Sequence, residues 1–231
     1  MTSPNEFEGK QVVVTGGTGA LGRSVVGGLL AGGASVHIPV MHARELDGFP
    51  YAEQVRCREG VDLRDEASCA AFYASVPGSL YASIHLAGGF SMGPFTDTSL
   101  AEYQKLVDLN VTTCFLSCRE ALRRMSGEGR LVNVAAKPAL VPTGGLVAYA
   151  LTKAAVAGLT LALAEEAGPR GVWVNAVVPS IMNTPANVAA MPDADHSAWP
   201  TTDDVAATIC FLASPLNRVT RGALVPVYGR S

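Results

Sequence analysis

Tyr149 and Lys153 lie four residues apart in a run of helix-forming residues, 147–155. On an α-helix this spacing places both side chains on one face, one turn apart. A free phenol titrates near pH ~10, which makes it a poor proton donor or acceptor at neutral pH. A neighbouring ammonium is expected to favour the phenolate and lower that pKa, which suits a general acid or base. We therefore predict a catalytic pair; the alternative is two ordinary side chains on a helix surface.

The elements around this pair alternate between strands and helices. The residue patterns predict strands at 10–15, 34–40, 55–57, 80–86, 130–134, 172–178 and 223–227, and helices at 23–31, 66–74, 100–125, 147–167 and 202–213. Such alternation indicates right-handed crossovers and a parallel sheet covered on both faces. We predict one doubly wound α/β domain over residues 1–231, with about seven strands. Residues 180–200 contain three prolines and have the length of a lid.

A glycine turn, Gly17-x-Gly19-x-x-Gly22, falls between the first predicted strand and helix. Glycines at this spacing allow a tight turn and a close approach of backbone N–H groups to a pyrophosphate at the helix N-terminus. The position in the first βα turn predicts a dinucleotide-binding Rossmann fold rather than a plain tight turn.

The end of the second predicted strand bears on the choice between NAD and NADP. An acidic residue there would bind the ribose 2′-hydroxyl of NAD. Residues 37–44 contain no Asp or Glu, whereas His42, Arg44 or Arg23 could meet a 2′-phosphate. We predict NAD or NADP with a slight preference for NADP; the alternative is that these side chains are merely solvated.

Composition excludes several classes of protein. The net charge is −3 and no basic run is present, so nucleic acid is not an expected partner. The five cysteines lack C-x-x-C or His-rich spacing, which predicts free thiols and no metal site. Cys114 and Cys118 share a helical face, and core packing explains that spacing.

The sequence also predicts where the protein is located and whether it forms oligomers. The segment 1–9 lacks a secretory pattern and no apolar run approaches the length of a membrane span, so we expect a cytoplasmic protein without a membrane partner. Only 16% of residues are charged, below the roughly 25% of soluble chains. Surface covered by another subunit would account for this.

The chain resembles a short-chain dehydrogenase/reductase over nearly its whole length. The matching elements, in the family's order, are the glycine turn Thr15 to Gly22 (with Ala20 where Gly is commonest), Asp62-Leu63, Leu86-Ala87-Gly88-Gly89 (with His85 and Leu86 replacing two Asn), Asn110, the pair Tyr149 and Lys153, and Asn175 to Thr184.

This resemblance implies a role for each matching position. The implied catalytic residues are Tyr149, Lys153 and Asn110, the last holding a relay water. The implied cofactor contacts are Gly16, Gly17, Thr18, Gly19, Ala20, Leu21, Arg44, Asp62, Leu63, Ala87, Gly88, Gly89, Tyr149, Lys153, Pro179, Ser180, Ile181 and Thr184. Ile181 and Thr184 are expected at the nicotinamide end, and a homodimer or homotetramer is expected with the helices at 100–125 and 147–167 as its interface.

Ala136 departs from the family, whose serine lies thirteen residues before the tyrosine. Losing that hydroxyl costs about 10²–10³ in rate when the substrate oxygen needs it. The segments around Ala136, Gly88 and Trp199 resemble quinonoid dihydropteridine reductase, in which charge spreads over a conjugated ring. Ala136 and Trp199 are therefore predicted beside a small-molecule substrate, although ordinary lid packing explains Trp199 and His196 equally well.

Three functions remain open. The first is hydride transfer to a conjugated substrate, with Tyr149 as the acid. The second is a carbonyl reductase in which Thr143, Ser91 or Ser180 replaces the missing serine. The third is a redox-inactive nucleotide sensor or scaffold, which retention of Asn110, Tyr149 and Lys153 disfavours.

Overall fold

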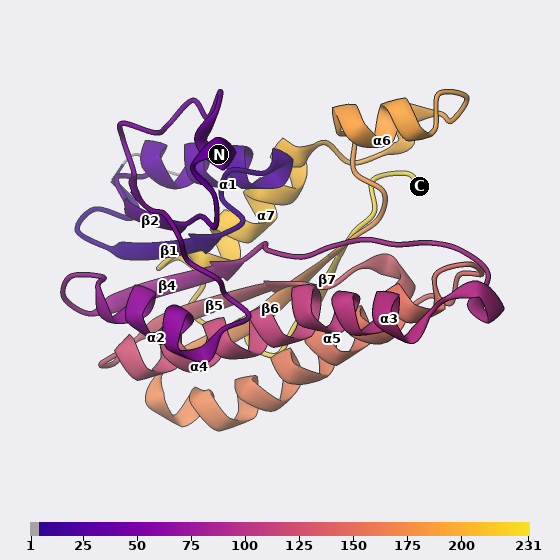
Figure 1. Cartoon of the computed structure of the whole chain (residues 1–231). Helices are drawn as coiled ribbons and strands as arrows, with labels where there is room; N and C mark the ends of the chain where they lie inside the picture. The colour runs from indigo at the N-terminus through magenta and orange to yellow at the C-terminus, as the bar shows by residue number, and fades with distance from the viewer. Residues whose placement is uncertain (1–4) are drawn as a thin grey trace.

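Seven parallel strands form one sheet in the order β3-β2-β1-β4-β5-β6-β7 (Figure 1). The computed structural model describes residues 5–231; the first four residues of the predicted polar N-terminal segment lie outside this range. The strands are β1 (Gln11–Thr15), β2 (Ser35–Pro39), β3 (Arg56–Arg58), β4 (Leu80–His85), β5 (Gly129–Val134), β6 (Val172–Pro179) and β7 (Leu224–Val227). The predicted doubly wound parallel sheet is confirmed.

Helices cover both faces of this sheet. They are α1 (Ala20–Ala31), α2 (Glu66–Ala74), α3 (Leu100–Val107), α4 (Thr113–Arg124), α5 (Val147–Ala167), α6 (Pro185–Ala190) and α7 (Thr202–Ala213). In Figure 1, α1 and α7 lie above the sheet, and α2, α4 and α5 lie below it. Two apolar clusters fill these two spaces, one around Val26 and Ile209 and one around Phe72 and Leu131. The central strands β1, β4, β5 and β6 are therefore buried on both sides, as their largely apolar sequences predict, whereas the edge strands β3 and β7 are partly exposed.

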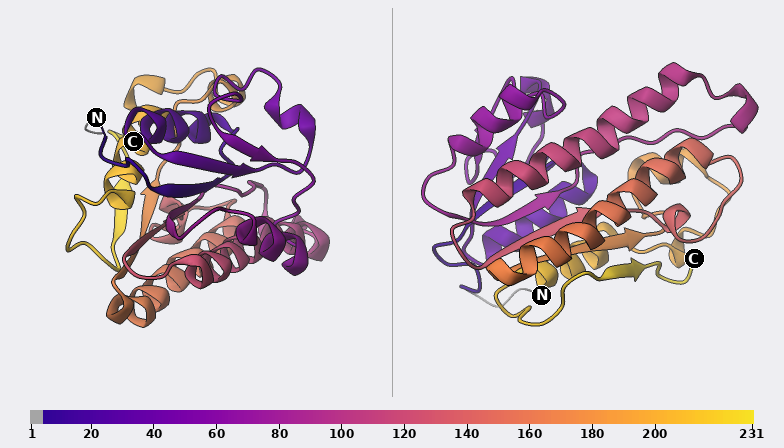
Figure 2. Two further views of the ribbon diagram at one scale, coloured as in Figure 1. Left: turned by 90° about the vertical axis from the view of Figure 1, so that its left-hand side faces the viewer. Right: turned by 90° about the horizontal axis from the view of Figure 1, so that it is seen from below.

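The predicted helix over 100–125 contains a wider π turn at Asp108–Thr112, which separates α3 from α4. Thr113 donates its backbone N–H to Asp108 O, five residues back. Seen from below (Figure 2, right), the two halves and α5 lie side by side across the sheet. A π turn has no clear signature in hydrophobic spacing, and such turns occur frequently at functional sites.

Two further elements differ from their prediction. Helix α1 begins at Ala20 rather than at 23, because Gly19 is its N-cap and the glycine turn leads directly into the first turn. The 180–200 segment contains α6, which has Thr184 as N-cap and Pro185 in its first turn. A helix of six residues is too short to produce a hydrophobic period.

Helix α5 and the short turn after it, Val147–Arg170, are long and apolar enough to cross a membrane by length and composition. The prediction that no segment approaches that length is therefore wrong. The helix packs against β5 and β6 and buries Lys153 and Thr160, so its place is that of a core helix.

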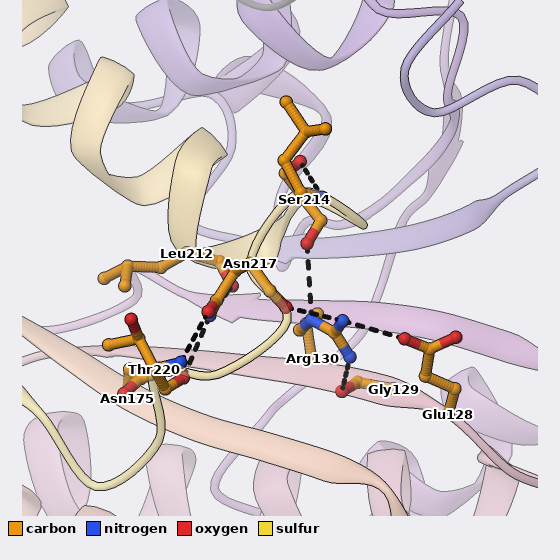
Figure 3. A network of polar contacts seen from close by, with 9 residues as sticks. Glu128, Gly129, Arg130, Asn175, Leu212, Ser214, Asn217 and Thr220 are labelled. Atoms are coloured by element: carbon orange, nitrogen blue, oxygen red, sulfur yellow. Dashed lines mark hydrogen bonds and ion pairs between the residues drawn. The ribbon is translucent and has the colours of Figure 1, made fainter.

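A buried guanidinium fixes the amino end of β5 (Figure 3). Arg130 is 0% exposed and donates to Gly129 O, Ser214 O and Asn217 O at 2.8, 3.3 and 2.7 Å. Its charge is paired with Glu128 at 2.9 Å. This network ties the sheet to the turn that follows α7, at the edge opposite the carboxyl ends of the strands.

Candidate active site

The candidate site begins where the strand order reverses, between β1 and β4. Leu86 donates its N–H to Thr15 O at 3.1 Å, and Ala87 donates to Thr15 Oγ1 at 3.3 Å. Gly16 follows with a φ of +66°, and a Cβ there would lie 2.8 Å from Ala87 N. The loops after both strands are thus in contact, and nucleotides bind at such a crevice in open α/β sheets.

The glycine turn above this crevice is closely packed. A Cβ on Gly22 would collide with Gly16 O, and one on Gly17 would lie 2.9 Å from Ile38 Cδ1. The N-cap Gly19 provides no side-chain cap, and the first turn of α1 has no acidic residue. Its N–H groups are therefore open to an anion, and they meet the partial positive charge of the helix N-terminus.

The three basic residues predicted near a 2′-phosphate differ in their contacts and exposure. Arg23 binds carbonyls, donating to Thr18 O at 3.0 Å and Gly48 O at 2.9 Å, so it fixes the glycine turn. His42 and Arg44 are exposed in the loop after β2. There Glu45 Oε1 accepts N–H bonds from Met41 and His42, both at 2.9 Å. Two backbone donors at the end of β2 therefore already converge on one anionic oxygen.

Asp62 and Leu63, the implied adenine contacts, follow β3. Arg64 donates to both carboxylate oxygens of Asp62 at 2.8 Å, and this hydrogen bonding lowers the pKa of Asp62. Leu63 is buried in the core below. Arg64 also reaches Met41 Sδ at 3.8 Å, which brings a cation of this loop to the end of β2.

Asn110 lies in the π turn and is 1% exposed. Its Oδ1 accepts the Gly89 N–H at 3.0 Å, while Nδ2 donates to Gly89 O at 3.0 Å and to Thr152 Oγ1 at 3.1 Å. Thr152 Oγ1 in turn donates to Tyr149 O at 2.8 Å. The amide thus clamps the loop after β4 to the helix carrying Tyr149, and both of its N–H donors are used within the protein.

Lys153 is buried beside this clamp. Its Nζ donates to Val134 O at 3.0 Å and would lie 3.5 Å from a Cβ on Gly88. Burial lowers the pKa of Lys153 to about 8. The ammonium therefore sits below the Gly88 loop, at the floor of the crevice.

Tyr149 lies on the same face of α5, with Lys153 Nζ 5.9 Å from its ring centre. Within residues 5–231 its hydroxyl has no hydrogen-bond partner. Burial raises the pKa of Tyr149 to about 12. The expectation that Lys153 lowers the Tyr149 pKa is therefore wrong for this structure, because desolvation of the phenolate dominates at this separation. The phenol is protonated at neutral pH, and in this environment it is a weaker acid than a free phenol.

Ala136 lies two residues after the end of β5 and is 6% exposed. Of the three residues predicted as substitute donors, Thr143 Oγ1 donates to Val141 O at 3.2 Å and Ser180 Oγ donates to Tyr228 O at 2.9 Å. Ser91 instead lines a cavity of about 180 Å³. The cavity opens against the start of α5, beside Ala148, and its other wall is formed by the loop from Ser91 to Thr98 and by Glu102 of α3.

The predicted lid is a folded segment. Pro179 is buried at the end of β6, Ile181 is 44% exposed, and Thr184 uses its hydroxyl to cap α6. Trp199 is only 8% exposed, and its ring lies 4.7 Å from that of His196. His196 Nε2 lies 2.7 Å from Met191 O. For Trp199 and His196, packing within the lid is the arrangement that the structure shows.

Sequence reasoning missed three residues of this site. Phe90 packs edge to face on Tyr149, with ring centres 5.0 Å apart, and remains 62% exposed. Thr152 links Asn110 to Tyr149, and Arg64 holds Asp62. Of these, only Phe90 could have been found from the sequence. An aromatic residue directly after a glycine loop fits no helical or strand pattern, so a role in the site would explain it.

Comparisons with known proteins agree on the class. The family model described as short chain dehydrogenase matches residues 10–195. A 2,5-dichloro-2,5-cyclohexadiene-1,4-diol dehydrogenase from Sphingobium indicum is 31% identical over 244 residues, covering 97% of both chains. The fold and these matches define an α/β enzyme of the dehydrogenase class. The chain belongs to the short-chain dehydrogenase/reductase family.

Solved structures of similar proteins have the same fold over nearly the whole chain. A short-chain type dehydrogenase/reductase from Mycobacterium ulcerans superposes with a TM-score of 0.89 at 29% identity, covering 97% of this chain and 90% of the other. A short chain dehydrogenase from Burkholderia cenocepacia, in complex with NADP, has a TM-score of 0.86 at 28% identity, with coverage of 97% and 98%.

Proposed function

We propose that this protein is an NAD(P)-dependent oxidoreductase that transfers hydride to a small conjugated or carbonyl substrate, with Tyr149 as proton donor. The observation that carries the proposal is the convergence of three parts. The glycine turn, the Gly88–Gly89 loop clamped by Asn110, and the pair Tyr149 and Lys153 all meet where the strand order reverses.

The residues present fit a dinucleotide. The uncapped N-terminus of α1 and residues Gly16 to Leu21 would hold the pyrophosphate, Asp62 and Leu63 the adenine, and Ala87 to Gly89 with Pro179 to Thr184 the nicotinamide half. When bound, the nicotinamide supplies the hydride. Lys153 would hold the adjoining ribose from below, and Tyr149 Oη would give its proton to the substrate atom that gains charge.

The experiment that tests this proposal has two stages. NADH and NADPH are titrated in parallel, with nicotinamide fluorescence as the readout. An acceptor panel follows, containing quinonoid dihydropterin, quinones and cyclic ketones. Binding with oxidation of at least one acceptor supports the enzyme. Binding without turnover across the panel would favour the nucleotide sensor and reject hydride transfer.

For the cofactor, we propose a preference for NADP. Its support is the pair of N–H groups of Met41 and His42, which converge on Glu45 Oε1, with exposed Arg44 in the same loop. A 2′-phosphate could displace that carboxylate and pair with Arg44. The Arg44→Ala substitution should weaken NADPH at least about tenfold and leave NADH unchanged, whereas Glu45→Gln should tighten NADPH. A loss of NADH affinity in Glu45→Gln would instead assign NAD, with Glu45 on the ribose hydroxyl.

For the substrate, we propose a flat ring of the kind reduced by quinonoid dihydropteridine reductase. The buried Ala136 side chain has no hydrogen-bond donor that could stabilise a negative charge on one substrate oxygen. The ring of Phe90, beside Tyr149, is exposed and could stack on a flat substrate ring. The Sphingobium relative is named for a cyclic diene-diol, which supports a six-membered ring as the substrate class. Among the acceptors, quinonoid dihydropterin should therefore give the highest kcat/KM.

We also propose a homodimer through α4 and α5. Phe115 on α4 is 48% exposed, and Leu151 and Leu161 on α5 are 53% and 45% exposed. Helices α4 and α5 run side by side in Figure 2 (right). Burial of these side chains would account for the low charge content. Light scattering should give twice the chain mass for the wild type and the monomer mass for Leu151→Glu with Leu161→Glu. A wild-type monomer would reject this interface.

A further inference from the structure

A buried polar cluster lies beneath the crevice, among β4, β5 and α4, and the proposed mechanism does not use it. Its members are His85, Cys114, Cys118 and Asn133, which are at most 5% exposed. The two sulfur atoms and a ring nitrogen of His85 all lie within 4.8 Å of one another. Cys114 and Cys118 are one turn apart on α4, while His85 and Asn133 come from adjacent strands. The sequence spacing of the cysteines alone predicts only packing; the fold adds the other two side chains.

Four of the six distances among these atoms are known individually, and the other two are at most 4.8 Å. Cys118 Sγ lies 3.4 Å from His85 Nδ1, and Asn133 Oδ1 lies 3.4 Å from each sulfur and 2.7 Å from His85 Nδ1. Tetrahedral Zn²⁺, bound about 2.3 Å from sulfur and about 2.0–2.1 Å from nitrogen or oxygen, places its ligand atoms roughly 3.4–3.8 Å apart. Insertion of the ion would therefore break the His85–Asn133 hydrogen bond and lengthen that distance by about 0.7 Å, while the three sulfur distances of 3.4 Å would change by at most about 0.4 Å.

The surrounding residues already orient these ligand atoms. Without an ion, His85 Nδ1 carries the ring proton, because Asn133 Oδ1 at 2.7 Å can only accept it. When a metal binds Nδ1, the proton moves to Nε2, where Ser83 Oγ at 2.8 Å can accept it. Asn133 Nδ2 donates to Thr160 Oγ1 at 2.9 Å, which turns Oδ1 toward the sulfur atoms. Partners of this kind fix the tautomer and orientation of metal ligands.

We propose that Cys114, Cys118, His85 Nδ1 and Asn133 Oδ1 form a buried site for one Zn²⁺ ion. Binding exchanges the two thiol protons, which leave to solvent, for one dication. The two thiolates then balance the ion's charge, so no net charge is buried. The ion would tie α4, directly after the π turn with Asn110, to the two central strands. Its role is structural and independent of the proposed reaction.

The full chain, without a metal-binding tag, tests this site. It is produced in zinc-supplemented medium, and a second sample is refolded with Zn²⁺; zinc per chain is measured by plasma mass spectrometry. We expect about one zinc per wild-type chain and less than about a tenth in His85→Asn and Cys118→Ala. The control is Cys210→Ala, which removes an equally buried thiol on α7 and should keep the zinc.

Cobalt binding keeps the test decisive if a variant fails to fold. Co²⁺ added during refolding of the wild type should give the near-ultraviolet band of thiolate-to-cobalt charge transfer, and zinc should raise Tm. A wild type that holds no zinc in either preparation and shows no such band would overturn the site. So would equal zinc in wild type and folded His85→Asn, since the metal would then be bound elsewhere.

Discussion

Asn110 and Gly89 hold each other through two hydrogen bonds of 3.0 Å, one in each direction between the side-chain amide and the backbone. A glycine is required next to this pair, because a Cβ on Gly88 would lie 2.5 Å from Asn110 Oδ1. Through Thr152 the same amide reaches the helix turn of Tyr149. The loop after β4 and the proposed proton donor are therefore positioned by a single side chain.

Tyr149→Phe removes the proposed proton donor and keeps the ring that packs on Phe90. We expect kcat to fall by about 10²–10⁴, the usual contribution of a general acid, while the Kd for the nicotinamide cofactor changes by less than about threefold. Steady-state turnover and fluorescence titration measure the two quantities. An unchanged kcat would remove Tyr149 from this role.

Ala136→Ser restores the hydroxyl that the family places beside the reacting oxygen. Because Ala136 lies just after β5 and is buried, the added hydroxyl tests whether one substrate oxygen must be stabilised. With a quinonoid ring as substrate the change should alter kcat/KM by less than about threefold. With a simple ketone it should raise kcat/KM by about 10²–10³. Ser91→Ala is the companion variant; a loss with ketones only would identify Ser91 as the substitute donor.

The Lys153→Met substitution removes a buried ammonium group, and it tests whether burial of that charge makes the stability of the wild type depend on pH. The folded-state pKa of about 8 lies below the 10.5 of a free lysine side chain, so between these values the unfolded chain binds more protons. Stability of the wild type should therefore rise with pH across that window, by roughly 2 kcal/mol between pH ~7 and ~10 relative to Lys153→Met. Urea unfolding at several pH values measures this difference. Parallel curves for the two proteins would show that Lys153 is not desolvated.

Substitutions of two glycines in the glycine turn should affect folding and nucleotide binding separately. Gly22→Ala forces a methyl group onto Gly16 O and should cost about 3 kcal/mol of unfolding free energy. Gly19 has φ −69° and meets only Gly16 O at 3.4 Å, so Gly19→Ala should fold normally yet bind the cofactor about tenfold more weakly. Gly127→Ala, which meets nothing within 4 Å, is the control. Wild-type affinity in Gly19→Ala would place the pyrophosphate elsewhere.

Arg130→Met should destabilise the chain by about 3–5 kcal/mol, since it leaves the carbonyls of Gly129, Ser214 and Asn217 without a buried donor. Glu128→Gln removes only an exposed partner, 66% accessible, and should cost under about 1 kcal/mol. Chemical denaturation monitored by circular dichroism compares the two. Similar losses in both variants would mean that the ion pair, and not the carbonyl network, supplies the stability.

Local patterns predicted most of the fold and the outline of the site. Strand-forming runs, the glycine turn and the Tyr149–Lys153 spacing act within a few residues, so the sequence displays them directly. The π turn and the pairing of Arg64 with Asp62 left no periodic signal. The pKa of Tyr149 and the cluster around His85 depend on burial and on residues brought together by the sheet. Those features arise only when distant segments pack.

The π turn at Asp108–Thr112 makes the protein sensitive to chain length at that point. Removing one residue there would let the helix continue in ordinary α register and would swing α3 by about 100° around its axis relative to α4. Glu102 and its neighbours would then leave the wall of the cavity beside Ala148, although the core beneath α4 would be unchanged. At this turn, a one-residue deletion should reshape the site more than most substitutions would.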